Sequence, residues 1–517
     1  MSRVHHGVTL RFRTMGQAAI LAFLIACNSR STEPHASPLP PVSLVAGNGQ
    51  SDTIQATLPK ALVVQIGPGP AGQSAAHQTV QFLAVLDSGG IVQETFVEPP
   101  SGAAQPLSSL AESTDASGRV TVVVGLGIHA GPARLVVSVP AFGYVDTARF
   151  TTTPGQATGI QPHPGDTAAY VNHTVTLQST VVDRRGNPRS GPVTYSLVSG
   201  PATLSGATAT VTAYGQVLIM GSGAGFEDTT TIAGVPIGTI AASFDNAGGI
   251  VVFNLDGSGY QRISGAQAGA LAWAPSGSSI AFDLNNPFGT ARGAEILQSV
   301  TLSGTLSTLD TSGSDLWPAY SHDGTWIYFV KDDEAGNPAL WRVHPDGSND
   351  ALVPMVSSPG VQNPSPSPND SQIVYIAPVS GIMHILMLSS GISTGVGGVT
   401  GEVAAWSPTN NVIAYVTGQL QLATVHSDGT AQAPLGSAQD FYESEIGWSP
   451  DGQWVIARNT ISGRLDIVNV TSNLVIPIPF TGGIGYPSWL PGQPVTSSIV
   501  PTRPSPKSRT GPLRPPR

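Results

Sequence analysis

Residues 391–395 read Gly-Ile-Ser-Thr-Gly, which is the G-x-S-x-G spacing of a nucleophilic serine. Such a serine works from a turn between a strand and a helix, with histidine and acid partners placed later in an α/β sheet. Here the chain continues as Val-Gly-Gly-Val at 396–399. Because that continuation predicts a connection between strands, we expect no catalytic serine at Ser393.

Residues 67–72 read Gly-Pro-Gly-Pro-Ala-Gly and formally fit the G-x-G-x-x-G pattern of dinucleotide sites. That site needs a helix to begin at the glycines and present its N-terminus to the pyrophosphate. Two prolines within the string predict a loop instead. We therefore expect no nucleotide cofactor, and no other cofactor motif is present.

The eleven histidines show no H-E-x-x-H or similar compact spacing, so no zinc site is predicted. The densest acid cluster is Asp332, Asp333 and Glu334. Grouped carboxylates suit calcium, but a solvated tip of a strand hairpin is the interpretation that we favour. No metal ligand is therefore assigned.

The single cysteine, Cys27, closes an apolar run from Met15 to Ala26 that follows three N-terminal arginines. The run is too short to span a membrane and is typical of a secretion signal. Its last residues, Leu-Ile-Ala-Cys at 24–27, resemble the bacterial lipobox, in which the cysteine sulfur is lipidated. This resemblance implies lipidation at Cys27 and an anchor in the cell envelope. Asn28 favours the outer membrane, on its periplasmic face or at the cell surface.

The composition predicts an all-β protein. The 517 residues include 60 Gly and 44 Pro, and only 10% of them are charged. Glycine and proline supply turn dihedrals and interrupt helices, so many short strands with tight turns are expected. The net charge of −10 excludes a nucleic-acid surface, which needs a basic face.

Two β-sandwiches are predicted between a Pro-rich tether at 28–42 and the C-terminal half of the chain. Residues 114–137 alternate apolar strands with polar turns and resemble bacterial Ig-like repeats. Residues 181–196 repeat the pattern of strand, Gly-Asn-Pro turn and strand. The predicted modules span 43–154 and 155–236, and their resemblance implies spacers, with adhesion as an alternative role.

The C-terminal half carries an internal repeat, Trp-Ser-Pro-Asp-Gly in its fullest form at 448–452. Related strings occur at 273–277, 320–324, 366–370, 406–410 and 489–492, and a short apolar strand follows every copy except the last. A second element, an apolar strand ending in a polar turn, occurs at 250–257, 297–304, 340–347, 385–391, 422–429 and 465–473. Two interleaved elements in each period predict blades of four strands.

These repeats resemble the WD40-like (PD40) repeats of the TolB family, which implies a six-bladed β-propeller over 237–499. The first strand-and-turn element has no Trp-Ser-Pro-Asp-Gly string before it, and the last string, at Trp489, has no strand pair after it. We therefore expect a mixed blade in which a C-terminal strand joins N-terminal strands and closes the ring. The Asp-Gly pairs are expected to be turns and the tryptophans to pack between blades. The basic, Pro-rich residues 500–517 are predicted to form a disordered tail.

A binding site is predicted at the channel mouth, from residues three to five positions before each repeated string. This set holds four acids, two amides and two aromatic side chains: Asp315, Trp317, Gln362, Asn363, Glu402, Glu443, Glu445 and Tyr486. Its charge favours a basic or amine-bearing segment of a partner.

We therefore expect a non-catalytic lipoprotein of the cell envelope that docks a protein or peptide on its propeller. The alternative is a carbohydrate-binding or carbohydrate-active propeller, a lectin, polysaccharide lyase or hydrolase, which would need clustered channel carboxylates. The second alternative is surface adhesion through the Ig-like modules.

Replacing Cys27 with serine should release the protein from membranes, because the sequence predicts no other anchor. Fractionation of cells that express each form measures this. Membrane retention of the Cys27→Ser variant at the level of the unchanged protein would contradict lipidation at Cys27.

Overall fold

The computed structural model describes residues 41–85, 94–98, 107–244, 248–284, 296–311, 315–332, 337–437, 440 and 442–491, without the side chains of 332 and 443–445. The regular elements in these ranges are strands and one 3-10 turn, η1 (Pro70–Gly72). None of them is a helix long and apolar enough to cross a membrane. The signal segment with Cys27, most of the Pro-rich tether and the basic tail lie outside the described residues. The chain divides into two compact units, residues 1–153 and 154–517.

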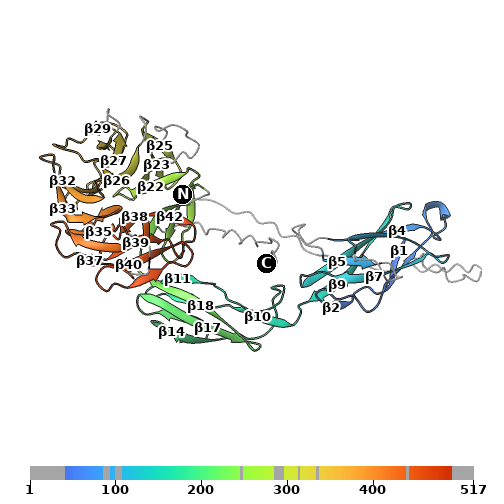
Figure 1. Cartoon of the computed structure of the whole chain (residues 1–517). Helices are drawn as coiled ribbons and strands as arrows, with labels where there is room; N and C mark the ends of the chain where they lie inside the picture. The colour runs from blue at the N-terminus through green and yellow to red at the C-terminus, as the bar shows by residue number, and fades with distance from the viewer. Residues whose placement is uncertain are drawn as a thin grey trace, which may run out of the picture. The chain divides into compact units, whose positions relative to one another are not determined.

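The first unit is a β-sandwich of two sheets (Figure 1). One sheet has the order β1-β3-β7-β5, with β1 (Val42–Ala46), β3 (Leu62–Ile66), β7 (Arg119–Leu126) and β5 (Thr95–Glu98). The other has the order β2-β9-β8-β4-β6, with β2 (Ser51–Thr53), β9 (Tyr144–Thr153), β8 (Gly131–Val139), β4 (Thr79–Ala84) and β6 (Ser109–Ser113). Alternate residues of β4, β7 and β8 are buried, and both sheets contribute to one apolar core.

The second unit begins with another set of sheets, over residues 157–235. These are β10-β13, β11-β18-β17-β14 and β12-β16-β15. Their strands are β10 (Ala157–Gln161), β11 (Thr167–Tyr170), β12 (Thr174–Thr176), β13 (Thr180–Asp183), β14 (Thr194–Ser199), β15 (Ala202–Ser205), β16 (Thr208–Val211), β17 (Gly215–Gly223) and β18 (Phe226–Val235). Ile219 and Ile232 are among the residues of their own apolar core.

Six four-stranded antiparallel sheets make up the rest of the second unit, and five of them are consecutive in the chain. These are β22 (Ala268–Trp273), β23 (Ser279–Leu284), β24 (Ile296–Thr301), β25 (Leu306–Asp310); β26 (Leu316–Tyr320), β27 (Ile327–Asp332), β28 (Pro338–Val343), β29 (Ala351–Leu352); β30 (Gln362–Pro366), β31 (Gln372–Ile376), β32 (Ile382–Met387), β33 (Ile392–Thr400); β34 (Val403–Trp406), β35 (Val412–Val416), β36 (Leu422–His426), β37 (Ala433–Pro434); and β38 (Tyr442–Trp448), β39 (Trp454–Asn459), β40 (Arg464–Asn469), β41 (Val475–Pro477).

The sixth sheet joins the two ends of this region in the order β21-β20-β19-β42. Its strands are β19 (Thr239–Phe244), β20 (Ile250–Asn254), β21 (Gln261–Ser264) and β42 (Ile484–Trp489). Ile240 pairs with Trp489 and Phe244 with Ile484 across the β19–β42 ladder. This is the mixed sheet that the phase of the two repeated elements predicts.

The six sheets form a closed β-propeller. Each first strand contacts the next in the series β22, β26, β30, β34, β38 and β42, and β42 contacts β22. In Figure 1 strands β22, β26, β38 and β42 lie toward the middle of the ring, and β29, β33 and β37 lie at its rim. The second strands are buried along nearly their whole length, as in β35 and β39, which explains their unbroken apolar sequences.

The repeated Asp-Gly strings are turns, as the sequence predicts. Ser449 is buried, and its hydroxyl donates to Asp451 Oδ1 over 2.5 Å and accepts the amide of Trp454 over 2.9 Å. Gly452 has φ +67°, a left-handed conformation that glycine adopts without strain. The turn thus positions the buried strand that follows.

The second sandwich packs against the propeller within the second unit. Ala168, Tyr170 and Val235 share one buried cluster with residues of β19, β20 and the last sheets. Tyr214 meets Trp454 edge to face, with ring centroids 5.0 Å apart. This part of the chain therefore forms one body with the propeller, whereas the sequence predicted a spacer.

Truncation before Tyr486 should abolish cooperative folding of the propeller, whereas truncation after Val500 should be tolerated. Burial of Trp489 and Leu490, which this truncation removes, is worth about 3–6 kcal/mol together, a large part of the about 5–15 kcal/mol that stabilises a typical protein. Loss of residues 486–489 of β42 also exposes part of the edge of β19. Thermal unfolding and light scattering measure both effects. Equal stability of the two truncated proteins would contradict closure by β42.

Candidate functional site

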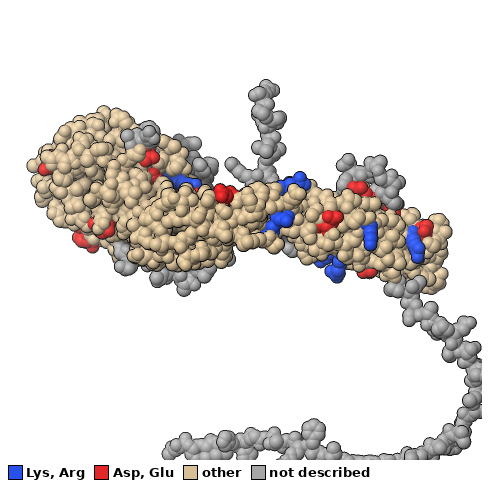
Figure 2. Space-filling view, turned by 90° about the horizontal axis from the view of Figure 1, so that it is seen from below, with Lys and Arg blue, Asp and Glu red and all other residues tan. Residues whose placement is uncertain are grey.

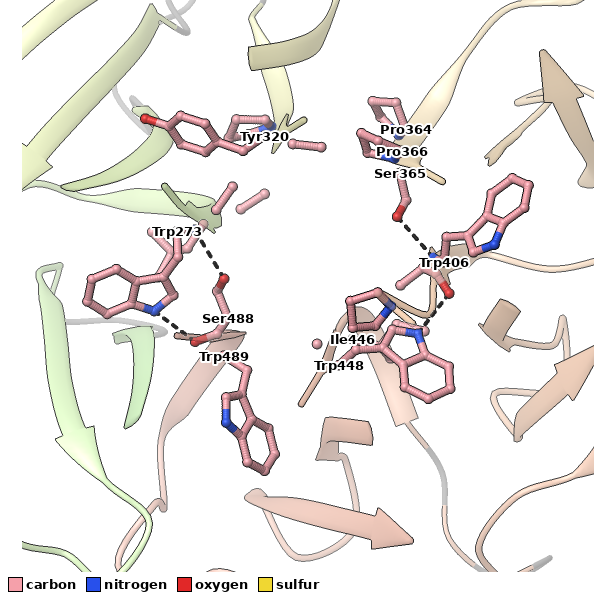
Figure 3. A pocket seen from close by; sticks show the side chains of 18 of the residues that line it. Trp273, Tyr320, Pro364, Ser365, Pro366, Trp406, Ile446, Trp448, Ser488 and Trp489 are labelled. Carbon is pink, nitrogen blue, oxygen red and sulfur yellow. Dashed lines mark hydrogen bonds between the residues drawn. The ribbon is translucent and has the colours of Figure 1, made fainter. Parts of the chain in front are cut away.

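A cavity of about 320 Å³ lies at the centre of the propeller, where the first strands of all six sheets end. Figure 3 shows tryptophans, prolines and small residues from several sheets arranged around it. We call this space the central cavity. Each blade contributes residues of its inner strand, and every blade except that of β30 also contributes the turn that follows, so the repeat itself generates the lining.

The lining of the central cavity is aromatic and proline-rich. Its aromatic residues are Trp273, Trp317, Tyr320, Trp406, Trp448 and Trp489. Its prolines are Pro275, Pro318, Pro364, Pro366, Pro408, Pro450, Pro487 and Pro491. Among the described lining residues there is no Asp, Glu, Lys or Arg, and the polar ones include Asn363, Ser365 and His322. The cavity therefore suits uncharged groups.

Hydrogen bonds between neighbouring blades hold the tryptophans in place (Figure 3). The Trp273 indole donates to the Ser488 carbonyl over 3.1 Å, and the Trp448 indole donates to the Ala405 carbonyl over 2.9 Å. The Trp406 amide donates to the Ser365 hydroxyl over 3.0 Å. Each bond satisfies a partly buried polar group and joins one inner strand to the next.

The inner strands are bulged just before the residues that reach the cavity. Register shifts interrupt the pairing of β22, β26, β30, β38 and β42 with their neighbours. Three residues at the same place in the repeat, Trp317, Asn363 and Tyr486, have φ of +54°, +48° and +50°. A left-handed conformation is costly for Trp317 and Tyr486 and less so for Asn363, and a bulge redirects the side chains beside it. The Trp317 amide is held by the buried carboxylate of Asp283 over 3.0 Å.

The structure brings two of the eight predicted site residues, Trp317 and Asn363, to the central cavity. Gln362 and Tyr486 are half-buried and Glu402 is exposed, and none of these three lines the cavity. The Asn363 amide does reach the Glu402 carbonyl over 3.2 Å. Glu443 and Glu445 belong to β38, but their side chains lie outside the described part.

Glu402 and Gln362 do not line the cavity, although the residues that follow them, Val403 and Asn363, do. Successive side chains of a strand point to opposite faces, so a residue one position from a lining residue can point elsewhere. The tryptophans and prolines of the repeated strings were the better signal. For these tryptophans the sequence predicts only packing between blades.

Asp315 is fully buried and is not an acid of the channel mouth, which corrects the prediction. It accepts the Leu297 amide over 3.3 Å. Burial, together with the nearby charge of Asp310, raises the pKa of Asp315 to about 8. The charge of Lys331 acts to lower the pKa of Asp315. The Lys331 ammonium group lies 2.8 Å from the Asp310 carboxylate and 3.1 Å from the Asp350 carboxylate. The carboxyl group of Asp315 is therefore mostly protonated at neutral pH. It belongs to the buried interior of the propeller.

The strings that resembled catalytic motifs lie in ordinary β-structure. Ser393 is in β33, a strand and not the expected connection, and its hydroxyl lies 2.6 Å from the Tyr375 hydroxyl and 3.4 Å from His384 Nδ1. Residues 67–72 form a loop that ends in η1. Side chains of Asp332, Asp333 and Glu334 lie outside the described residues. Within the described ranges no three His, Cys, Asp or Glu side chains are grouped as metal ligands are.

Comparison with known proteins gives distant structural similarities. No protein-family model matches the chain, and no curated protein matches it. Among solved structures, TolB from Acinetobacter baumannii is 17% identical with a TM-score of 0.41, over 58% of this chain and 83% of that one. A putative TolB from Agrobacterium tumefaciens is 17% identical with a TM-score of 0.37, over 47% of this chain and 89% of that one. A gluconolactonase from Xanthomonas campestris is 12% identical with a TM-score of 0.35, over 45% and 80%.

The Asp315→Asn variant should be more stable than the unchanged protein at pH 8, and the difference should disappear near pH 4. The folded-state pKa of Asp315 is raised from 3.8 to about 8 by burial. The contribution of Asp315 to the free energy of unfolding is therefore fully present below the unfolded-state pKa. It is lost as the pH rises through the folded-state pKa. Unfolding midpoints between pH 4 and pH 9 measure the effect.

The Asp323→Asn variant is the control, because the contribution of Asp323 to stability should change with pH in the opposite direction. Hydrogen bonds from Ser321 and Thr325 lower the pKa of Asp323, so its contribution is present at neutral pH and is lost in acid. Parallel pH profiles for the unchanged protein and the Asp315→Asn variant would show that Asp315 is ionised in the folded state.

Proposed function

We propose that this chain is a non-catalytic binding protein of the bacterial cell envelope, anchored by lipid at Cys27. In this proposal a six-bladed TolB-like propeller docks a protein or peptide, and two Ig-like modules precede it. The observation that carries the proposal is the central cavity, at which all six inner strands converge. Its about 320 Å³ are at the small end of the range for ligand sites, enough for a few side chains.

The lining favours an uncharged segment of the partner over the basic segment that the sequence suggested. Trp317 is partly exposed in the cavity, and the prolines present rigid apolar surface without backbone donors. Aromatic faces and prolines bind aromatic, aliphatic or proline side chains with little loss of conformational entropy. Asn363 and His322 add the few polar groups that orient a ligand.

Carbohydrate cleavage receives less support from this cavity. Glycoside hydrolysis uses a pair of carboxyl groups that face the sugar. Among the described residues, the two carboxyl groups whose pKa values are clearly raised, Asp315 and Asp466, do not belong to the cavity lining. A peptide is therefore the ligand that we favour.

The sparse charge of the described surface also favours docking at a single site, the central cavity. Figure 2 shows a face on which Lys, Arg, Asp and Glu are widely spaced and most of the described surface is uncharged. Long-range electrostatic attraction is therefore weak, and recognition depends on close fit. A preformed cavity supplies such a fit.

The Ala319→Arg variant should reduce peptide binding at least about tenfold, because a long charged side chain would occupy the cavity. Ala319 is half-buried on β26 and lines the cavity. Peptides selected from a displayed random library on the unchanged protein supply the ligands, and calorimetry gives the affinities. The selected sequences should be rich in aromatic residues and proline and poor in charge.

The Ser307→Arg variant is the matched control, since Ser307 is exposed on the outer strand β25. It should bind the same peptides with unchanged affinity. If both arginine variants bind them equally well, the docking site lies outside the central cavity. Selection of glycans but no peptides from an array would favour the carbohydrate alternative.

A further inference from the structure

A second pocket lies where the second sandwich meets the last propeller sheet. It has a volume of about 480 Å³ and is lined by Gln216 of β17 and by residues of β39, β40, β41 and nearby loops. We call it the junction pocket. Its polar side is formed by Gln216, Asp440, Asn459, Ser462 and Asp466, and its apolar side by Ile461, Leu474, Val475 and Pro477. None of these residues lines the central cavity.

The polar side of the junction pocket holds two carboxylates that share one donor. Asn459 Nδ2 donates to Asp466 Oδ2 over 2.8 Å and to Asp440 Oδ1 over 3.0 Å. The Tyr442 hydroxyl donates to Asp466 Oδ2 over 3.3 Å. Asp466 is only 1% exposed, yet its Oδ1 has no hydrogen-bond partner. A buried acceptor without a donor is costly, and a ligand that supplies the donor removes that cost.

None of the ion pairs among the described residues joins a cation to these carboxylates. Arg464 is close enough to favour the charged form of Asp466, but no described hydrogen bond or ion pair joins the two. Burial, followed by the charge of Asp440, raises the pKa of Asp466 to about 6, so its carboxylate remains mostly charged at neutral pH. A buried negative charge with a free acceptor atom favours a cationic ligand.

We propose that the junction pocket binds a primary alkylammonium group, as found at the end of a lysine side chain or a polyamine. An ammonium has three donors and no acceptor. Asp466 Oδ1, the Asp440 carboxylate and the Gln216 amide oxygen provide acceptors on the polar side. The aliphatic stem lies along Leu474, Val475 and Pro477, which are all partly exposed.

The same residues fit a metal ion poorly. Calcium takes six to eight oxygen ligands, and about that many are needed for a stable protein site. Here the Asn459 amide nitrogen lies between the two carboxylates. The Asn459 amide oxygen is occupied by the Ile461 and Ser462 amides at 3.0 Å and 3.2 Å. Too few oxygens remain to surround a divalent cation.

A ligand in this pocket would contact both parts of the second unit, because Gln216 belongs to the sandwich and the carboxylates belong to the propeller. Binding should therefore stabilise their packing. Ammonium binding in the junction pocket does not depend on peptide docking, since none of the pocket residues lines the central cavity.

Calorimetric titration of the full chain with n-pentylammonium chloride tests the proposal, with 1-pentanol as the uncharged analogue. We expect saturable binding of the ammonium, none of the alcohol, and weaker binding as ionic strength rises. The Asp440→Asn and Asp466→Asn variants should each lose at least about tenfold in affinity, because each loses a charge-assisted hydrogen bond. Gln216→Ala should show a smaller loss.

Asp346→Asn is the matched control, because Asp346 is an exposed turn carboxylate bonded to Ser348 in another sheet. It should bind pentylammonium like the unchanged protein. Since Asp466 is buried and its substitution could impair folding, Asp440→Asn and Gln216→Ala carry the test alone if Asp466→Asn unfolds. Equal binding of 1-pentanol, undiminished binding by these two variants, or displacement of the amine by micromolar calcium would overturn the proposal.

Discussion

The pairing of β19 with β42 is the interaction on which the rest of the propeller depends. It joins strands that are separated by the whole length of the ring, and it buries Ile240 against Trp489. Without it, two sheet edges would stand open and the inner strands would have no fixed spacing. The ring geometry, and therefore the central cavity, follows from this one non-local contact.

The central cavity is built from features that repeat in the chain. In three of the turns that follow inner strands, the hydroxyl of Ser321, Ser367 or Ser449 accepts an amide at the beginning of the next strand. Prolines of such turns, among them Pro408 and Pro450, line the cavity. Bulges before these turns rotate the side chains, and Trp317 and Asn363 reach the lining from left-handed conformations. Strain of this kind persists only where the surrounding packing enforces it. Hydrogen bonds between blades, such as Trp448 to Ala405, supply that packing.

The two units contribute differently to the molecule. The first sandwich has a complete core of its own, formed by residues such as Phe82 and Leu135. The second sandwich shares its apolar surface with the propeller through Tyr170 and Val235. This shared surface creates the junction pocket, where a buried carboxylate from the propeller lies beside Gln216 of the sandwich. The second sandwich is therefore part of the body that presents both proposed sites.

The sequence by itself determined the β-structure, the repeat and the closing strand, because these depend on local periodicity, turn residues and the phase of repeated strings. It also predicted a loop at residues 67–72 in place of the α-helix that a dinucleotide site needs. Only the tertiary structure decided which side chains face the cavity, because bulges shift the register and a shift of one residue moves a side chain to the other face. Burial of Asp315 and the contact of Tyr214 with Trp454 likewise arise from residues far apart in the chain, which no local pattern specifies.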